Sequence, residues 1–186
     1  PNAAVNPPWT GTNATAWLSG DYTGSGDDEA TSTSWNDPPT TAADDWLISP
    51  QVMINANSSL AWDGEAISSN FNDGYEVYVT TGAQNSAGCQ SGTMVYSTTG
   101  ENSFRTTHNV DLAANGYASQ NVRVCFRNNS TDMFLLAIDN VRIGTTGPGC
   151  SFTEQKLDYV TIVDCAVPAP VTDGDADVMS GCVPLT

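Results

Sequence analysis

The sequence predicts an all-β fold, in which two antiparallel sheets pack against each other as a sandwich. Several segments alternate apolar and polar residues, which is the pattern of half-buried strands. NDGYEVYVTTG (72–82) is the clearest, because a turn-forming Asn-Asp-Gly precedes Tyr75, Val77 and Val79, which alternate with Glu76 and Tyr78. No segment of ten or more residues keeps the 3.6-residue period of a helix.

The expected strands follow one another with turn-forming residues between them, at spacings typical of a sandwich. They are residues 45–54, interrupted by Pro50, then 58–67, 72–82, 93–99, 104–112, 121–128 and 133–143. Residues 1–43 are rich in turn-forming residues and show little periodicity. One more strand is expected at 156–167, after the Gly/Pro/Thr-rich break GTTGPGC.

The charge of the chain excludes several classes of partner. Asp and Glu number 21 against 5 Lys and Arg, so the formal net charge is -16. Nucleic acids and anionic membrane surfaces are bound through Lys and Arg and are therefore not expected partners. An acidic surface favours divalent cations, of which calcium is the most available outside cells. No stretch of 18 apolar residues predicts a membrane span.

Sequons and cysteines favour an extracellular location. N-x-S/T sequons make candidate glycosylation sites of Asn13, Asn57, Asn128 and Asn129. Disulfides persist outside cells, and the candidate disulfide cysteines are Cys89, Cys150, Cys165 and Cys182. Cys125 reads equally well as a buried thiol or as a paired cysteine.

No catalytic site is expected. The single histidine, His108, lies in an alternating strand and reads as a surface or cross-strand residue, and no G-x-S-x-G elbow is present. A zinc site is not expected either, because the cysteines lack CxxC spacing and partner histidines. The sequence therefore predicts a protein that is not an enzyme.

Four segments in this order resemble one known family. They are DWLISP (45–50), NDGYEVYVTTG (72–82), VDL (110–112) and VRVCFRNNSTDMFLLAIDNVRI (122–143). The series is similar to the choice-of-anchor J, or cleaved-adhesin, family of jelly-roll domains, which includes the adhesin modules of gingipains and is distantly related to MAM domains. The resemblance covers Trp35 to Ile143 and implies an extracellular, non-catalytic jelly-roll sandwich that often carries structural calcium.

The resemblance also implies where calcium would bind. The family's last strand usually ends in an Asp-Asp pair whose first acid helps to bind the metal, and Asp139-Asn140 takes that place here. Candidate calcium ligands are therefore Asp44, Asp45 and Asp139. Phe134, Leu136 and Ile138 are expected to face the core, with Asp139 pointing the opposite way, near Asp44 and Asp45.

The five tryptophans divide into two groups. Trp46 and Trp62 lie in expected strands and are predicted to be core residues. Trp9, Trp17 and Trp35 lie outside them and are candidates for stacking on sugars.

The functional hypothesis depends on the two ends of the chain. Residues 1–143 are expected to form the jelly-roll domain, and 144–186 a linker, the surplus strand and a cysteine-containing tail that packs on the domain or on a neighbour. The family's usual first strand has no counterpart before Trp9, where Pro7 and Pro8 donate no N–H. A surplus strand and an open groove invite pairing.

Two arrangements follow, and the sequence leaves both open. The tail could fold back into the groove, or the groove could take a strand from another copy, donated by the tail or by residues 1–8. Head-to-tail donation does not close, so it would build a homopolymeric filament or adhesive fibre. The predicted function is thus a subunit of an extracellular surface filament; the alternative is a monomeric carbohydrate- or protein-binding adhesin module of a larger secreted protein.

Overall fold

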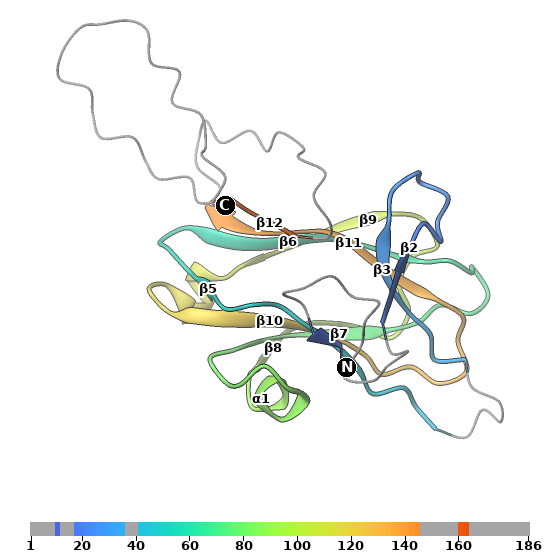
Figure 1. The fold of residues 1–186 in the computed structure, drawn as a ribbon, viewed down its shortest axis with the longest axis horizontal. Coiled ribbons are helices and arrows are strands. Elements are labelled where there is room, and N and C mark those ends of the chain that lie inside the picture. The colour runs from blue at the N-terminus through green and yellow to red at the C-terminus, as the bar shows by residue number, and fades with distance from the viewer. Residues whose placement is uncertain (1–9, 12–16, 36–40, 146–159, 164–186) are drawn as a thin grey trace, which may run out of the picture.

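The protein is a sandwich of two sheets, as the sequence predicts, and each sheet has six described strands (Figure 1). The computed structural model describes residues 10–11, 17–35, 41–145 and 160–163. All the strand pairs are antiparallel except one, between the last two strands of the described chain.

The first sheet has the order β1-β4-β10-β7-β8, and β5 also pairs with β10. Its strands are β1 (Thr10–Gly11), β4 (Asp45–Ile48), β5 (Val52–Met53), β7 (Tyr75–Thr80), β8 (Thr93–Thr98) and β10 (Asn121–Asn128). The expected strand 45–54 is thus two strands, because Pro50, which cannot donate to a ladder, separates β4 from β5.

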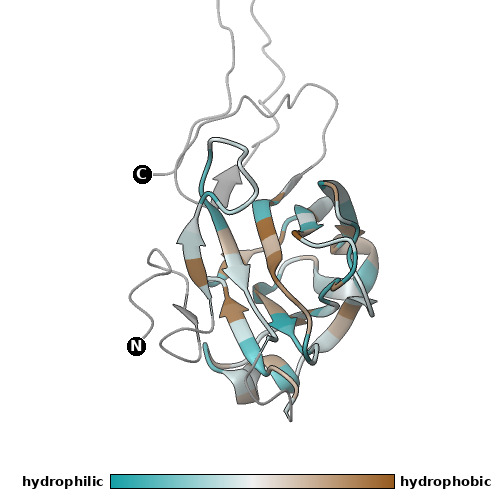
Figure 2. Cartoon of the chain, turned by 90° about the vertical axis from the view of Figure 1, so that its right-hand side faces the viewer, coloured by the Kyte–Doolittle hydropathy of each residue, from teal (hydrophilic) through white to brown (hydrophobic). Residues whose placement is uncertain are grey.

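The second sheet has the order β2-β3-β11-β6-β9, and β12 also pairs with β11. Its strands are β2 (Leu18–Gly20), β3 (Glu29–Ser32), β6 (Ser58–Ala66), β9 (Thr106–Asp111), β11 (Leu136–Thr145) and β12 (Val160–Val163). Every second residue of β6 is buried, which is the alternation that predicted this strand. Figure 2 shows hydrophobic and hydrophilic bands along the strands.

The aromatic core lies between the two sheets. Trp62 of β6 and Phe126 of β10 are both fully buried, and their ring centroids are 5.7 Å apart across the sandwich. Trp46 is also fully buried, so the prediction that Trp46 and Trp62 are buried is confirmed. Trp46, however, packs in a second cluster with Ile48, on the outer side of the first sheet.

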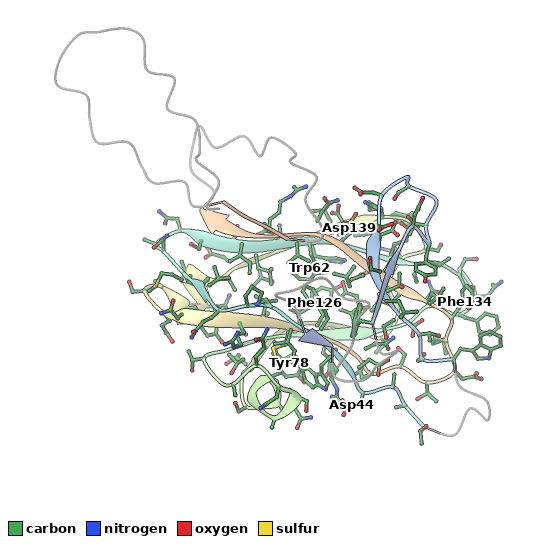
Figure 3. The ribbon with its side chains drawn as sticks, in the orientation of Figure 1. Asp44, Trp62, Tyr78, Phe126, Phe134 and Asp139 are labelled. Atoms are coloured by element: carbon green, nitrogen blue, oxygen red, sulfur yellow. A yellow bond between two sulfur atoms is a disulfide. The ribbon has the colours of Figure 1, made fainter. Side chains whose placement is uncertain are left out.

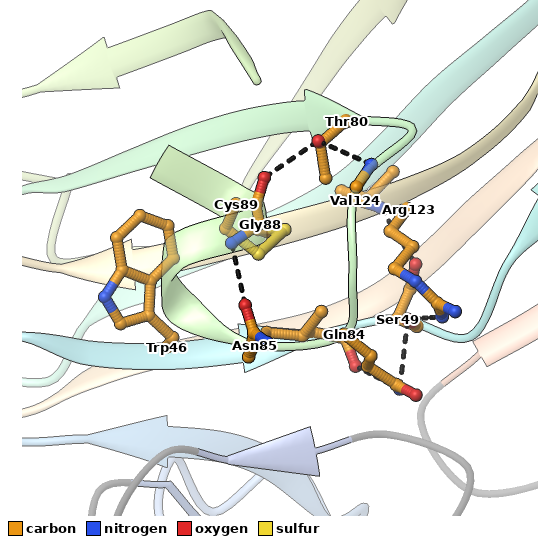
Figure 4. The surroundings of a disulfide bond; sticks show 12 residues. Trp46, Ser49, Thr80, Gln84, Asn85, Gly88, Cys89, Arg123 and Val124 are labelled. Atoms are coloured by element: carbon orange, nitrogen blue, oxygen red, sulfur yellow. Dashed lines mark hydrogen bonds between the residues drawn. A yellow bond between two sulfur atoms is a disulfide. The ribbon is translucent and has the colours of Figure 1, made fainter. Parts of the chain in front are cut away.

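A five-residue helix, α1 (Ser86–Gln90), covers that outer cluster (Figure 4). Asn85 caps it, because its side-chain oxygen accepts a hydrogen bond from the Gly88 N–H at 2.8 Å. Thr80 donates a hydrogen bond to the Gly88 carbonyl at 2.8 Å, and a Cβ at position 88 would lie 2.1 Å from the Ala83 carbonyl oxygen. Position 88 therefore has room only for glycine.

A disulfide joins α1 to the first sheet. Cys89 of α1 is bonded to Cys125 of β10, 36 residues away (Figure 4). Cys89 is thus a disulfide cysteine, as expected, but its partner is Cys125 and none of the other three candidates, so Cys125 is a paired cysteine. Cys150, Cys165 and Cys182 lie outside the described residues.

The described helices are α1 and a π-helical turn at Ala113–Tyr117, η1. Neither has the length or the apolar character of a membrane-spanning helix.

Candidate functional site

The two edges of β11 are paired in different ways. On one edge β6 pairs with β11 from Leu136 to Thr145. On the other edge β3 pairs only with residues 136–138, and β12 pairs in parallel with residues 141–144. We call the edge of β11 at residues 141–144 the strand slot.

The strand slot lies over the core. Val141 and Ile143 are 3% and 2% exposed and belong to the main hydrophobic cluster. The residues of β12 at the register positions opposite them are Val160 and Ile162. Without a strand in the slot, the N–H and C=O groups on this edge would lose their partners beside buried apolar residues, which is unfavourable.

A bulge separates the two halves of β11. The register with β6 shifts between Asp139 and Arg142, and Asn140 within it has a φ of 50°. Asparagine tolerates this left-handed conformation better than most residues, and here its side-chain N–H groups donate to Asp63 at 2.9 Å and to Asp139 at 3.3 Å. The bulge lies where β3 ends and the strand slot begins.

An ion-pair cluster lies beside the bulge. Arg105 donates to Asp139 at 2.6 Å and to Glu29 at 3.2 Å, and its Nε lies 4.0 Å from Glu65. Glu29 is fully buried and also accepts hydrogen bonds from Thr23, Ser25 and the Tyr22 N–H. The cluster joins β3, β11, β6 and the start of β9 through one guanidinium.

Burial raises the pKa of Asp139 above its ordinary value, although the Asn140 N–H and the Arg105 guanidinium lower it. Burial lowers the pKa of Arg105, but the carboxylates of Asp139 and Glu29 more than compensate, so its pKa is raised overall. The guanidinium therefore supplies the positive charge that these buried carboxylates require.

The structure separates the three expected calcium ligands. Asp139 lies on the second sheet and Asp44 below the first, at opposite sides of the sandwich (Figure 3). Asp44 accepts hydrogen bonds from Trp46 at 2.9 Å and Arg127 at 2.8 Å, whereas Asp45 accepts one from Ser32 at 3.0 Å. The expectation that Asp139 lies near Asp44 and Asp45 is therefore wrong, and the three residues do not fit a shared calcium ion. In the described residues, no group of three or more Asp, Glu, His or Cys side chains is arranged to hold a metal.

A second surface feature lies at one end of the sandwich, where exposed apolar side chains gather; we call it the end patch. Trp35 is 64% exposed, Phe71 55% and Phe134 37%, and Met133 is half-buried beside them. With Asp132 these residues line a pocket of about 290 Å³. The Trp35 and Phe134 ring centroids are 6.3 Å apart, at an angle of 55°. Phe134 therefore does not face the core, contrary to expectation, whereas the prediction for Leu136 and Ile138 is confirmed.

The loops that carry the end patch are tied together. Ser34, fully buried, donates to Asp73 at 2.7 Å and accepts from the Met133 N–H at 3.0 Å. The Phe134 N–H donates to the Phe71 carbonyl at 3.2 Å, and Thr33 donates to the Phe134 carbonyl. The aromatic rings thus project from a hydrogen-bonded framework.

The other sugar-stacking and glycosylation candidates are placed as follows. Trp17 is fully buried, so it cannot stack on an external sugar, and that expectation is wrong. The prediction that Asn128 is a glycosylation site is also wrong, because its side-chain amide is buried and donates to Ser32 and Asp73, both at 3.1 Å. Asn57 is exposed, Asn129 is half-buried, and both stay predictions. Trp9 and Asn13 lie outside the described residues.

The sequence did not reveal the network around His108. Its Nε2 lies 2.8 Å from Glu101, which also accepts a hydrogen bond from Tyr75 at 2.8 Å. Trp62 donates to the Tyr75 hydroxyl at 2.9 Å, and burial raises the pKa of Tyr75. The chain of hydrogen bonds ends in the core at Trp62, and it connects β6, β7 and β9 as a structural network.

The fold is similar to known adhesin domains. No protein-family model and no curated protein sequence matches this chain. Among solved structures, the K1 cleaved adhesin domain of Lys-gingipain from Porphyromonas gingivalis W83 has a TM-score of 0.62 and 20% identity, covering 78% of this chain and 95% of that domain. The K2 domain of Lys-gingipain has a TM-score of 0.58 and 19% identity, covering 76% and 92%. TmCBM61, solved with β-1,4-galactotriose, has a TM-score of 0.51 and 12% identity, covering 74% and 88%. This chain therefore has the two-sheet fold of the gingipain cleaved adhesin domains, which its sequence motifs predicted.

Proposed function

We propose that this chain is a non-catalytic extracellular structural protein, a subunit that assembles with copies of itself into a filament by head-to-tail strand exchange. The observation that carries the proposal is the parallel pairing of β12 with β11 in the strand slot. No other described strand covers this part of the edge of β11.

The parallel direction favours a strand from another copy. Two consecutive strands that lie side by side and parallel need a crossover of a dozen or more residues, which is usually a helix packed on the sheet. The 14 residues between β11 and β12, from 146 to 159, begin with a Gly/Pro/Thr break and show no apolar period of 3.6. A strand donated by a neighbour occupies the slot without any such crossover.

Donation in one direction gives an open polymer. The slot of one subunit receives the strand of the next, whose own slot remains free for a third. Such a heterologous contact continues indefinitely unless the rotation between subunits closes a ring. In the structure the strand in the slot is the chain's own β12, so the competing arrangement is a tail that folds back onto its own sheet.

The extracellular location is supported by the Cys89–Cys125 disulfide, because such bonds persist in oxidising compartments. The fold shared with gingipain cleaved adhesin domains supports a non-catalytic adhesive module. Among the described residues, the hydrogen-bond network of His108 ends in the core at Trp62 and has the character of a structural network.

The proposal is tested in the full-length protein with matched substitutions in β12. Wild-type protein is expected to form filaments in negative-stain micrographs and to elute as polymer in size exclusion. Ile162→Asp should abolish polymer, because it places a charge opposite buried Ile143, whereas Thr161→Asp lies opposite half-buried Arg142 and should retain it. Wild-type protein that stays monomeric at all concentrations would overturn the proposal.

A second candidate function is glycan binding by a monomeric module. It is favoured by the exposed Trp35 ring beside Phe134 and by the likeness of the fold to TmCBM61, solved with a galactotriose. A glycan array tests it: binding that is lost on Trp35→Ala supports this function, and an array without binding counts against it.

Calcium binding remains a prediction of the acidic charge and the resemblance. Asp44, Asp45 and Asp139 do not lie together, so any ion would need another set of oxygen ligands. Isothermal titration with CaCl₂ tests for it directly.

A further inference from the structure

We propose that the end patch is the surface on which the neighbouring subunit that donates its strand rests, so that the filament is held by an apolar end-to-end contact as well as by the exchanged strand. This inference rests on the strand exchange proposed above. The occupant of the patch is a second copy of this chain.

The direction of β12 sets which ends of two subunits meet. β12 runs parallel to β11, so a donated strand enters the slot beside Val141 and leaves it beside Gly144. The residues that precede it come from the side where β11 begins. β11 begins at Leu136, two residues after Phe134 of the end patch. The donating subunit therefore approaches from the end of the sandwich that carries the patch.

The donor presents its opposite end. Its connection to β12 leaves from Thr145, the last residue of β11, which pairs with Ser58 at the start of β6. β5 lies at the same end, to the left in Figure 1, whereas Phe134 lies at the right-hand end in Figure 3. We call this the far end; among the described residues there, Met53 of β5 is 51% exposed. Strand polarity thus brings the far end of one subunit to the end patch of the next.

The connecting residues are long enough for this contact. From Phe134 to Val141 a strand advances about 23 Å at about 3.3 Å per residue. Fourteen residues reach at most about 46–50 Å when fully extended. About 25 Å therefore remains between the donor's Thr145 and the acceptor's end patch, which allows the two ends to touch.

The chemistry of the end patch fits a protein surface better than a sugar. Its pocket is lined by three aromatic rings and a methionine, and Asp132 is the polar residue among them. Sugar sites combine aromatic rings with several hydrogen-bonding side chains, whereas the centre of a protein interface is depleted of charge and enriched in aromatic residues and methionine. Two chains of net charge -16 repel each other, so a mostly apolar contact at their ends is where apolar burial can offset repulsion.

The experiment separates this inference from strand exchange itself. Arg142 and Thr161 are register partners across β11 and β12, so Arg142→Cys with Thr161→Cys, in a background with Cys150, Cys165 and Cys182 changed to Ser, reports the strand's position by disulfide formation. Into this protein we introduce Trp35→Ser with Phe134→Ser, or Met53→Ser. The matched control is Met94→Ser, because Met94 is 49% exposed and pairs with Tyr78 of the outer cluster, away from the end patch.

The patch variants should polymerise at a critical concentration about tenfold higher than the control, since losing about 1.4 kcal/mol of contact is a factor of ten. Their remaining polymers should still give a ladder of cross-linked chains.

Equal critical concentrations in patch and control variants would overturn the inference while the ladder upholds strand exchange. Only intramolecular cross-links in every variant would overturn strand exchange itself. Glycan binding lost with the patch, at unchanged polymerisation, would assign the patch to sugars instead. Circular dichroism checks that each variant is folded.

Discussion

At the scale of single residues, Arg105 decides what the acidic residues near β11 do. The resemblance of the sequence to cleaved adhesins predicted Asp139 as a calcium ligand, but its carboxylate lies 2.6 Å from the Arg105 guanidinium. Nothing in FRTTHNV (104–110) distinguishes Arg105 from an exposed strand residue, because its partners come from three other strands. Trp17 and Phe134 were misplaced for the same reason: their burial depends on which distant segments cover them.

Arg105→Met should reduce the free energy of unfolding, measured by urea denaturation in the monomeric Ile162→Asp background. The variant leaves Asp139 and fully buried Glu29 without their cation. We expect a loss of about 1–3 kcal/mol at pH 7, less than for a fully buried pair because the Arg105 side chain is 33% exposed. Arg105→Lys keeps the charge and should lose less.

This loss should depend on pH. Because burial raises the pKa of Asp139 above its ordinary 3.8, the folded state holds a proton more readily than the unfolded state. Stability from this group is therefore fully present below pH 3.8 and is lost as the pH rises through the raised pKa. Removing Arg105 raises that pKa further, so the deficit of Arg105→Met should be smallest near pH 4 and largest at neutral pH. Equal deficits at both would contradict this role.

At the scale of elements, the strands with clear alternation were predicted and the short strands near the N-terminus were not. In β6, β7 and β10, which have six to nine residues, buried and more exposed side chains largely alternate, and strands of this length are long enough for a period of two to be recognised. β1, β2 and β3 have two to four residues and lie in a turn-rich segment, where no period can be recognised. α1 is also too short for a helical period, and it is held by its Asn85 cap and by the disulfide.

The Cys89–Cys125 disulfide should contribute about 3–4 kcal/mol to stability, the loop-closure entropy expected for a loop of 36 residues. Adding reductant should therefore lower the urea midpoint of Ile162→Asp protein. The double variant Cys89→Ala with Cys125→Ala should be less stable and insensitive to reductant. A midpoint that does not change on reduction, with the thiols shown to be free by mass spectrometry, would rule out this contribution.

At the scale of the whole molecule, the fold was predictable and the assembly only in outline. Motif order between Trp35 and Ile143 predicted the cleaved-adhesin sandwich, because strand order and turn chemistry are local properties of the sequence. The surplus strand was also visible, and four of its residues form β12. Its parallel direction depends on the edge of β11 that β3 leaves free, and no local sequence pattern predicts that edge. The same direction sets the polarity of the proposed filament.

The central claim, that the strand in the slot comes from another subunit, is tested most directly by mixing two proteins that each carry one introduced cysteine besides the Cys89–Cys125 disulfide. One carries Arg142→Cys and the other Thr161→Cys, both with Cys150, Cys165 and Cys182 changed to Ser. Neither chain can cross-link its own slot through the introduced cysteines. After mixing, assembly and oxidation, strand exchange predicts a covalent heterodimer that contains one chain of each kind. If each chain's tail fills its own slot, the mixture stays uncross-linked, whereas one chain carrying both substitutions forms an intramolecular bond; that pair of results would contradict the account.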